Sequence, residues 1–281
     1  MKKFKSFLFL TSCIVLLIFT IHFEAMAQEI VPVEELQSTK NTVSAAVYER
    51  NIYETAYSME ELGQEIRSNI NNREQAFSIR YVNNISSLKD GIKSIFDEAM
   101  SQDDYFHYTI QRYSYIYKGY EGDVTISFNI QYLETKEQVD YVDSRIDDIL
   151  GKIINDNMND YQKEKAIHDY IVLNVKYDTT LTEHTAYAAL AKGEAVCQGY
   201  SLLAYKMLNK AGIETRIIEG TARELHLWNL VKLDGKWYHL DCTWDDPLPN
   251  RDGYISYKFF NLTDEQISAD HRWVKSYPQA S

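Results

Sequence analysis

The segment between Gly193 and Pro247 concentrates the residues that could do covalent chemistry. It contains Gly-Glu-Ala-Val-Cys-Gln-Gly-Tyr at 193–200, His-Leu-Trp-Asn at 226–229 and Trp-Tyr-His-Leu-Asp-Cys-Thr-Trp-Asp-Asp-Pro at 237–247. A thiol nucleophile needs a sulfur, an imidazole that transfers protons, and an acceptor that orients the imidazole. We predict that Cys197, His226 and Asp241 form this triad.

A helix is predicted to begin at Cys197. Apolar residues recur at helical spacing over 200–211, and Gly212 suits the helix end. Gly193 can end the preceding element in a left-handed turn, and Gly199 would let the backbone approach another group closely. At the first turn of a helix the N–H groups and the dipole favour a thiolate and can help to stabilise an oxyanion.

A β-hairpin is predicted after this helix. Residues 226–233 and 236–243 have strand character, and Asp234-Gly235 between them is a two-residue turn signal. A tight turn of this kind pairs Leu233 with Lys236. That pair sets the register of the whole ladder.

The predicted register brings His226 and Asp241 together. His226 would pair with Thr243 and Asp241 with Trp228, so these side chains share one face and Asp241 lies diagonal to His226. His239 shares this face and is the alternative imidazole. We favour His226 because it lies nearer the open end of the hairpin.

Cys242 is predicted to stay apart from Cys197. Two cysteines could pair in an oxidising compartment. However, strand alternation points Cys242 to the face opposite Asp241, which disfavours a disulfide and also a zinc site, whose ligands must converge. We therefore predict one reactive cysteine and no metal site.

The spaced motifs resemble those of the transglutaminase-like superfamily, particularly its secreted bacterial members. The resemblance rests on Gly-x-x-x-Cys-x-Gly-Tyr, His-x-Trp-Asn and Trp-Tyr-x-Leu-Asp-x-Thr-Trp-Asp-Asp-Pro. It extends to Ile-His-Asp-Tyr at 167–170, Tyr-Lys-Phe-Phe-Asn-Leu at 257–262 and Asp-His-Arg-Trp at 270–273. In all it covers roughly residues 155–275.

This resemblance implies an α+β fold with a papain-like core, in which the helix that bears the cysteine packs on an antiparallel sheet. Carried over, Cys197 is the nucleophile, His226 the general base and acid, and Asp241 the residue that orients His226. These roles agree with the triad predicted from the hairpin.

Three aromatic residues are further candidates for the site. Tyr187, upstream of the thiol, is a candidate oxyanion donor, and Trp228 and Trp244 could shield a thioester from water. Core packing is the alternative for each of them. His168 lies beside the apolar stripe of a predicted helix, where we expect a structural histidine.

Residues 1–27 predict a secretory signal. A basic start (Lys2, Lys3 and Lys5) precedes a mostly apolar run over 7–23 and the small-x-small site Ala25-Met26-Ala27. We therefore expect a secreted or cell-envelope protein. A retained N-terminal anchor is the alternative.

The rest of the chain divides into three predicted parts. Residues 28–75 predict a linker followed by a helix, which we place within 43–70. Residues 76–134 predict a small α+β domain of the order β-α-β-β that ends in a Tyr-rich hairpin with strands at 105–117 and 124–133. Residues 135–281 predict the transglutaminase-like domain. In that last part Thr135 and Asp160 are predicted helix caps.

Motifs and charge together predict a cysteine-dependent amide hydrolase or acyl transferase that needs no cofactor. Without residues 1–27 the chain keeps 26 basic and 40 acidic residues, a net charge of −14, which argues against nucleic acid and anionic lipid as partners. The expected substrate is a protein or peptide, for instance a cell-wall or surface protein. The alternative is a non-catalytic cell-envelope binding module that retains the fold.

Overall fold

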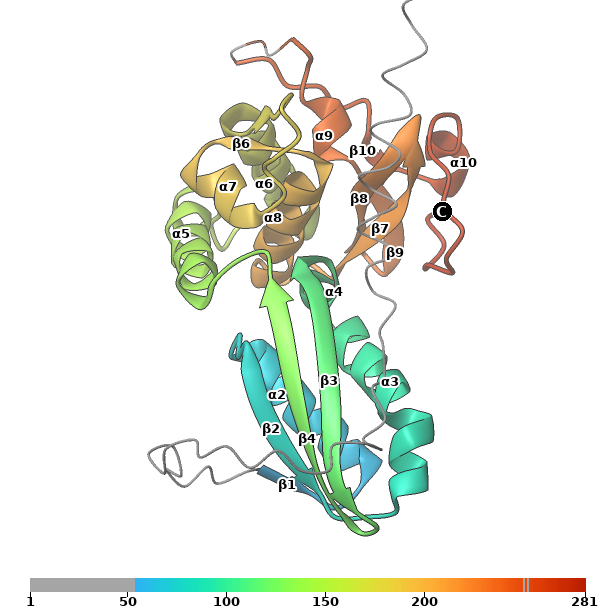
Figure 1. Cartoon of the computed structure of the whole chain (residues 1–281). Coiled ribbons are helices and arrows are strands. Elements are labelled where there is room, and N and C mark those ends of the chain that lie inside the picture. The colour runs from blue at the N-terminus through green and yellow to red at the C-terminus, as the bar shows by residue number, and fades with distance from the viewer. Residues whose placement is uncertain (1–53, 250, 252) are drawn as a thin grey trace, which may run out of the picture. The chain divides into compact units, whose positions relative to one another are not determined.

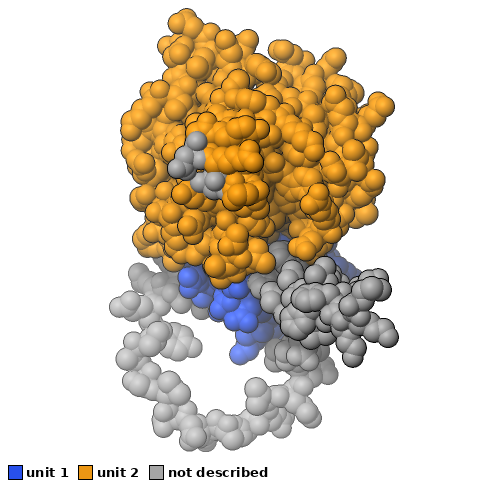
Figure 2. Space-filling view, turned by 90° about the horizontal axis from the view of Figure 1, so that it is seen from above, with its two compact units in different colours: residues 1–102, 110–132 blue, residues 103–109, 133–281 orange. Residues whose placement is uncertain are grey.

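The computed structural model describes residues 54–249, 251 and 253–281. They form two compact units, shown as ribbons in Figure 1 and in separate colours in Figure 2. Of the described residues, unit 1 holds 54–102 together with 110–132, and unit 2 holds 103–109 and those from 133 to 281. The predicted signal at 1–27 lies outside the described residues. Within the described chain no helix is long and apolar enough to cross a membrane.

Unit 1 is a four-stranded sheet with two helices on one face (Figure 1). The strands are β1 (Glu54–Ala56), β2 (Ala76–Tyr81), β3 (Ile110–Tyr120) and β4 (Asp123–Tyr132), and the helices are α2 (Met59–Asn71) and α3 (Ile85–Ser101). The spatial order is β1-β2-β4-β3, with β1 and β2 parallel. The order predicted for 76–134, strand, helix and hairpin, is present as β2, α3, β3 and β4.

Two boundaries in this region differ from the prediction. The helix expected within 43–70 begins only at Met59, because Ser58 caps it by accepting a hydrogen bond from the N–H of Glu61. The residues just before it form β1 instead, and those before 54 lie outside the described residues. The chain therefore joins β1 and α2 to the same unit as β2.

The strand predicted from Tyr105 starts only at Ile110. The preceding residues form α4 (Asp104–Thr109), which belongs to unit 2. There the carboxylate of Asp104 accepts hydrogen bonds from the guanidinium of Arg216 at 2.7 and 3.0 Å and from the N–H of Ile217 at 2.8 Å. These hydrogen bonds within unit 2 hold the segment as a helix, although its tyrosines favour a strand.

Unit 2 packs helices against an antiparallel sheet and confirms the predicted α+β class. Its larger helices are α5 (Lys136–Ile153), α6 (Asp160–Asn174), α7 (Ala186–Ala191) and α8 (Cys197–Lys210). The sheet has the order β10-β9-β8-β7, with β7 (Thr215–Ala222), β8 (Glu224–Leu233), β9 (Lys236–Leu240) and β10 (Phe260–Leu262). Short elements complete the unit: β5 (Lys176–Tyr177), β6 (Glu194–Ala195), α9 (Cys242–Asp245) and α10 (Asp264–Ile267).

The caps of α5 and α6 follow their sequences closely. Thr135 caps α5 in a capping box with Gln138, as predicted. For α6 the cap is Asn159 and not Asp160, because Asn159 forms the reciprocal box with Gln162. Such caps typically contribute about 1 kcal/mol each to helix stability.

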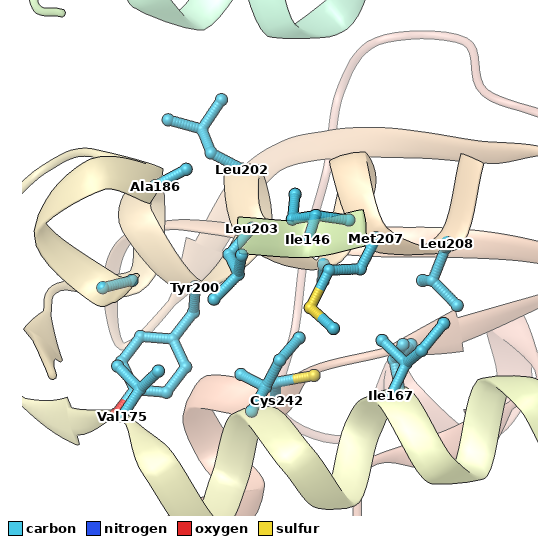
Figure 3. Close-up of a cluster of buried hydrophobic side chains, with 14 of the residues drawn as sticks. Ile146, Ile167, Val175, Ala186, Tyr200, Leu202, Leu203, Met207, Leu208 and Cys242 are labelled. Atoms are coloured by element: carbon cyan, nitrogen blue, oxygen red, sulfur yellow. The ribbon is translucent and has the colours of Figure 1, made fainter. Parts of the chain in front are cut away.

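Helix α8 lies at the centre of the unit 2 core. It contacts α5, α6 and α7 as well as β7 and β8. Figure 3 shows its side chains Tyr200, Leu203 and Met207 among Ile146 of α5 and Ile167 of α6. Each fully buried aliphatic side chain contributes roughly 1.5–3 kcal/mol. The core therefore fixes the helix that begins at Cys197.

Candidate active site

Cys197 is the first residue of α8, as the sequence predicts, and the residue is 9% exposed. Val196 before it has extended backbone and makes no side-chain cap hydrogen bond. No cap at Val196 therefore competes with a substrate for the N–H groups at this helix start.

Gly199 allows the thiol helix to pack tightly at its first turn. A Cβ at this position would lie 2.9 Å from the carbonyl oxygen of Thr185 and 2.6 Å from the Cβ of Ala195. The close backbone approach expected at Gly199 is thereby confirmed, and Thr185 is itself the residue that caps α7. The absence of a side chain at Gly199 thus lets α7 and α8 meet beside Cys197.

The hairpin of β8 and β9 has the predicted turn and register. Asp234 and Gly235 both have positive φ, 50° and 79°, as a two-residue hairpin turn of this type requires. Leu233 pairs with Lys236 as predicted. On the other side of β8, His226 pairs with Gly220 of β7.

Asp241 leaves the ladder that was predicted to contain it. The strand ends at Leu240, and Asp241 becomes the N-cap of α9, accepting hydrogen bonds on Oδ1 from the N–H groups of Thr243 at 3.0 Å and Trp244 at 3.1 Å. Asp241 does not pair with Trp228, nor Thr243 with His226, because the capping carboxylate ends the strand.

The predicted closeness of His226 and Asp241 nevertheless holds. Nε2 of His226 donates to Oδ2 of Asp241 at 2.7 Å, and the Asp241 side chain is fully buried. The sulfur of Cys197 lies close enough to the His226 imidazole to help raise its pKa. The structure thus brings all three predicted triad residues into one chain of contacts.

Electrostatics at this site favour a charged imidazole. Burial of His226 disfavours its charge, but the carboxylate of Asp241 and the sulfur of Cys197 outweigh burial and raise the pKa of His226 to about 10. Burial also opposes ionisation of Asp241, yet the charge of His226 and its hydrogen bond hold the pKa of that carboxyl well below its usual range.

His271 is a site residue that the sequence did not single out beyond its place in the Asp-His-Arg-Trp motif. Its Nε2 donates to the same Oδ2 of Asp241 at 3.0 Å, and its ring is fully buried. It lies thirty positions beyond Asp241 in the chain, where neither periodicity nor turn chemistry connects the two. Its place in the Asp-His-Arg-Trp motif was the one signal that the sequence offered.

His226, Asp241 and His271 also offer ligand types that zinc uses. One ligand atom from each lies within 4.8 Å of the others. The separations of 2.7 and 3.0 Å between the imidazole nitrogens and Asp241 are those of N–H···O hydrogen bonds. Two imidazole N–H groups that donate to the Asp241 carboxylate therefore explain why these three side chains lie close together.

His239, the alternative imidazole, supports Trp228. The indole Nε1 of Trp228 donates to Nδ1 of His239 at 2.9 Å, and Nε2 of His239 donates to Asp264 at 2.8 Å. Trp228 in turn stacks on His226, with ring centroids 5.8 Å apart. Both nitrogens of His239 are thus occupied, and Trp228 is buried against the imidazole that faces the thiol.

Of the remaining aromatic candidates, Trp244 lies beside His226 and Tyr187 lies beside Tyr141. Trp244 is partly buried beside His226, with ring centroids 6.1 Å apart. Tyr187 packs its ring against Tyr141, and its N–H donates to Glu134. None of the contacts described for Tyr187 joins it to Cys197, so its role as an oxyanion donor stays a prediction.

His168 and Cys242 are buried residues outside the predicted triad. His168 is fully buried, with Nε2 bonded to Asp245 at 3.2 Å and Nδ1 to Asp169 at 3.1 Å, as a structural histidine would be. Cys242 is a free thiol in the core shown in Figure 3. Cys242 is the first residue of α9 and not part of a strand, so the strand alternation that predicted its direction was wrong. Its thiol nevertheless lies in the core and forms no disulfide with Cys197, as predicted.

Comparison with known protein families supports the resemblance. Residues 147–242 match the family model of the Transglutaminase-like superfamily, a range that contains Cys197, His226 and Asp241 but ends before His271. The match confirms the resemblance to the superfamily that the sequence motifs indicated, and it does not test the narrower likeness to secreted bacterial members.

Curated relatives match only part of this chain. Human kyphoscoliosis peptidase is 22% identical over 143 residues, and mouse kyphoscoliosis peptidase is 21% identical over 145. Each alignment covers 43% of this chain and 22% of the relative. The chain thus spans about a fifth of the length of these relatives.

Solved structures similar to the chain include two proteins described as enzymes. One, described as a TGase, shares 17% sequence identity over 75% of this chain and 64% of its own, with a TM-score of 0.37. The other, a candidate cysteine protease from Cytophaga hutchinsonii, shares 16% identity over 50% of this chain and 68% of its own, with a TM-score of 0.32.

Proposed function

We propose that this transglutaminase-like chain is a secreted thiol enzyme that acts on amide bonds of proteins or peptides. The observation that carries the proposal is the placement of His226 beside Cys197 and in a hydrogen bond with the buried Asp241. A merely structural site has no need of a charged imidazole next to a thiol at a helix start. The sequence of residues 1–27 supports secretion.

In the proposed first step the Cys197 thiolate attacks the carbonyl carbon of an amide. A C–S bond forms, and the carbonyl π electrons move onto oxygen, where N–H groups at the start of α8 can stabilise the oxyanion. When the tetrahedral intermediate collapses, the C–N bond breaks. The imidazolium of His226 gives its proton to the leaving nitrogen, so ammonia or an amine departs and a thioester remains.

In the second step another nucleophile resolves the thioester. Neutral His226 now takes a proton from water or from an amine as that nucleophile attacks, and the Cys197 sulfur leaves as the thiolate. Water yields a carboxylic acid, the outcome of a protease or deamidase, whereas a lysine amine yields a new amide cross-link. We favour hydrolysis because water is always present at high concentration, and we expect a cell-wall or surface protein as substrate.

The test is to incubate the protein with casein and with a glutamine-containing peptide library, with and without an added primary amine. We expect release of ammonia or of new peptide ends that Cys197→Ala abolishes, and mass spectrometry of the products separates hydrolysis from amine incorporation. Activity that survives in Cys197→Ala would point to another nucleophile. No turnover of any substrate, with Cys197 no more reactive than Cys242, would favour the non-catalytic binding module.

A further inference from the structure

Asp241 receives hydrogen bonds from two imidazoles on the same oxygen. His226 and His271 both donate to Oδ2, at 2.7 and 3.0 Å, while the N–H groups of the first turn of α9 occupy Oδ1. Each oxygen of the carboxylate thus accepts two hydrogen bonds. A triad of sulfur, imidazole and carboxylate requires only one of the two imidazoles.

A β-bridge next to His271 in the chain holds it beside Asp241. The next residue, Arg272, forms an antiparallel bridge with Thr221 of β7, with hydrogen bonds of 2.8 and 2.9 Å. Its carbonyl oxygen lies over Gly220, where a Cβ would come within 2.1 Å of it. Gly220 is the residue that pairs with His226. The missing side chain therefore lets the segment of His271 lie directly beside β7, the strand that pairs with the one carrying His226.

The surroundings of His271 define which nitrogen carries its proton. The ring is enclosed by aromatic side chains, with centroids 4.9 Å from Trp228, 4.8 Å from Trp244 and 5.5 Å from Phe259. Among the described residues, Nδ1 of His271 has no hydrogen-bond partner although it is buried. The hydrogen-bond geometry thus places a proton on Nε2, directed at Asp241.

We propose that His271 is a positioning residue of the active site, whose Nε2–H holds the Asp241 carboxylate so that its Oδ2 faces His226. With two donors on each oxygen the carboxylate cannot rotate without breaking hydrogen bonds. His226 therefore keeps its orientation beside the sulfur of Cys197. The inference rests on the proposed function and adds a fourth residue to the site, from outside the range that matches the family.

Three substitutions separate this role from simple packing. In His271→Gln the side-chain amide nitrogen reaches the position of Nε2 and can still donate to Asp241. In His271→Asn the amide nitrogen reaches only the position of Nδ1, and His271→Phe keeps an aromatic ring in the aromatic cluster with no donor. Near-ultraviolet circular dichroism and thermal unfolding show whether each variant keeps the native fold, and His271→Asn remains informative if His271→Phe does not.

Two rates are measured on each variant, both with a chelator present to exclude bound metal. One is alkylation of Cys197 by iodoacetamide at neutral pH, followed by mass spectrometry, which needs no substrate. The other is steady-state turnover of whichever substrate the wild type processes, resolved into kcat and KM. We expect His271→Asn and His271→Phe to lower kcat about 100-fold with KM nearly unchanged, since misplacing a reacting group by about 1 Å costs that much.

His271→Gln is expected to restore most of both rates. Equal rates in the wild type and folded His271→Asn would overturn the positioning role, as would an equal loss in His271→Gln and His271→Asn. These outcomes differ from failure of the proposed function, in which wild-type Cys197 itself would be alkylated no faster than Cys242.

Discussion

Cys197 and Cys242 occupy similar positions and have opposite surroundings. Each is the first residue of a helix, and the two residues are 9% and 3% exposed. Cys197 lies beside His226 and raises the pKa of its imidazole, whereas Cys242 lies among apolar side chains, where burial and the carboxylates of Asp245 and Asp241 raise the pKa of its thiol. The two cysteines therefore share a helix start and differ in their neighbours, an imidazole beside Cys197 and apolar side chains around Cys242.

Adjacent residues in one short helix turn serve both environments. The carboxylate of Asp241 faces His226, while the thiol of Cys242, the next residue, enters the core with Met207 and Ile167 (Figure 3). The capping of α9 by Asp241 directs these two side chains apart. The polar site and the apolar core thus meet between two consecutive residues, Asp241 and Cys242.

The largest expected effect comes from removing the charge on Asp241. Asp241→Asn should lower kcat by at least about 1000-fold, because an amide cannot stabilise the imidazolium of His226 and can select the wrong tautomer. Iodoacetamide should then alkylate Cys197 almost as slowly as Cys242, so the difference between the thiols disappears. Asp246→Asn is the matched control, since that buried carboxyl accepts from Tyr200 at 2.7 Å and an amide oxygen can do the same. A rapidly alkylated Cys197 in Asp241→Asn would contradict this view.

The second effect is the contrast between the thiols in the unmodified protein. At pH 7 we expect Cys197 to react with iodoacetamide at least about 100-fold faster than Cys242, because a thiol whose pKa lies well above 9 holds less than about 1% thiolate at that pH. Peptide mapping by mass spectrometry measures both rates in one sample. In urea the two rates should converge, which shows that the fold creates the difference. Similar rates in the native protein would remove the basis for an activated Cys197.

Local signals in the sequence were sufficient to predict the thiol, the imidazole and most of the hairpin. Asp234-Gly235 fixed the pairing of Leu233 with Lys236, because a two-residue turn permits only one register. The same rule failed at Asp241, where side-chain capping competes with strand pairing. An aspartate before Cys-Thr-Trp-Asp is a helix-cap signal, and at this position it prevailed over strand alternation.

His271 and α4 could not be derived from local pattern. His271 reaches Asp241 only through the bridge between Arg272 and Thr221 and the open space at Gly220, which are tertiary contacts. Likewise the tyrosines from residue 105 favour a strand by composition, but Asp104 binds Arg216 and the segment forms a helix. By contrast, the late start of α2 was readable, since Ser58 followed by Glu61 is a capping-box pattern.

A smaller effect is expected from Glu164, whose carboxylate contributes to the high pKa of Cys242. Glu164 is fully buried, and burial raises its own pKa to about 8 against an opposing hydrogen bond from Asn261. The unfolded chain loses this proton first, so Glu164 lowers the free energy of unfolding as pH rises from about 4.5 to 8.

Glu164→Gln should remove this pH dependence and raise the free energy of unfolding at pH 8.5 by on the order of 2 kcal/mol. A glutamine can keep the acceptor for the Nδ2 of Asn261 and add a donor for its Oδ1, one of the buried atoms with no partner among the described residues. Urea unfolding at pH 5 and 8.5 measures the difference, while alkylation of Cys197 serves as the control and should not change. A stability gain as large at pH 5 as at pH 8.5 would count against ionisation as the cause.

The smallest effect should come from shortening Cys242 itself. Cys242→Ala removes a buried sulfur from the core and should lower the free energy of unfolding by about 1 kcal/mol, with kcat and the alkylation of Cys197 unchanged. Cys197→Ala should do the reverse, abolishing turnover while costing little stability, because its thiol sits at the edge of the core and not within it. Urea unfolding and turnover are measured on both variants. We expect Cys242→Ala to change only stability and Cys197→Ala to change mainly turnover. A loss of turnover in a folded Cys242→Ala variant would show that the two environments are coupled across Asp241.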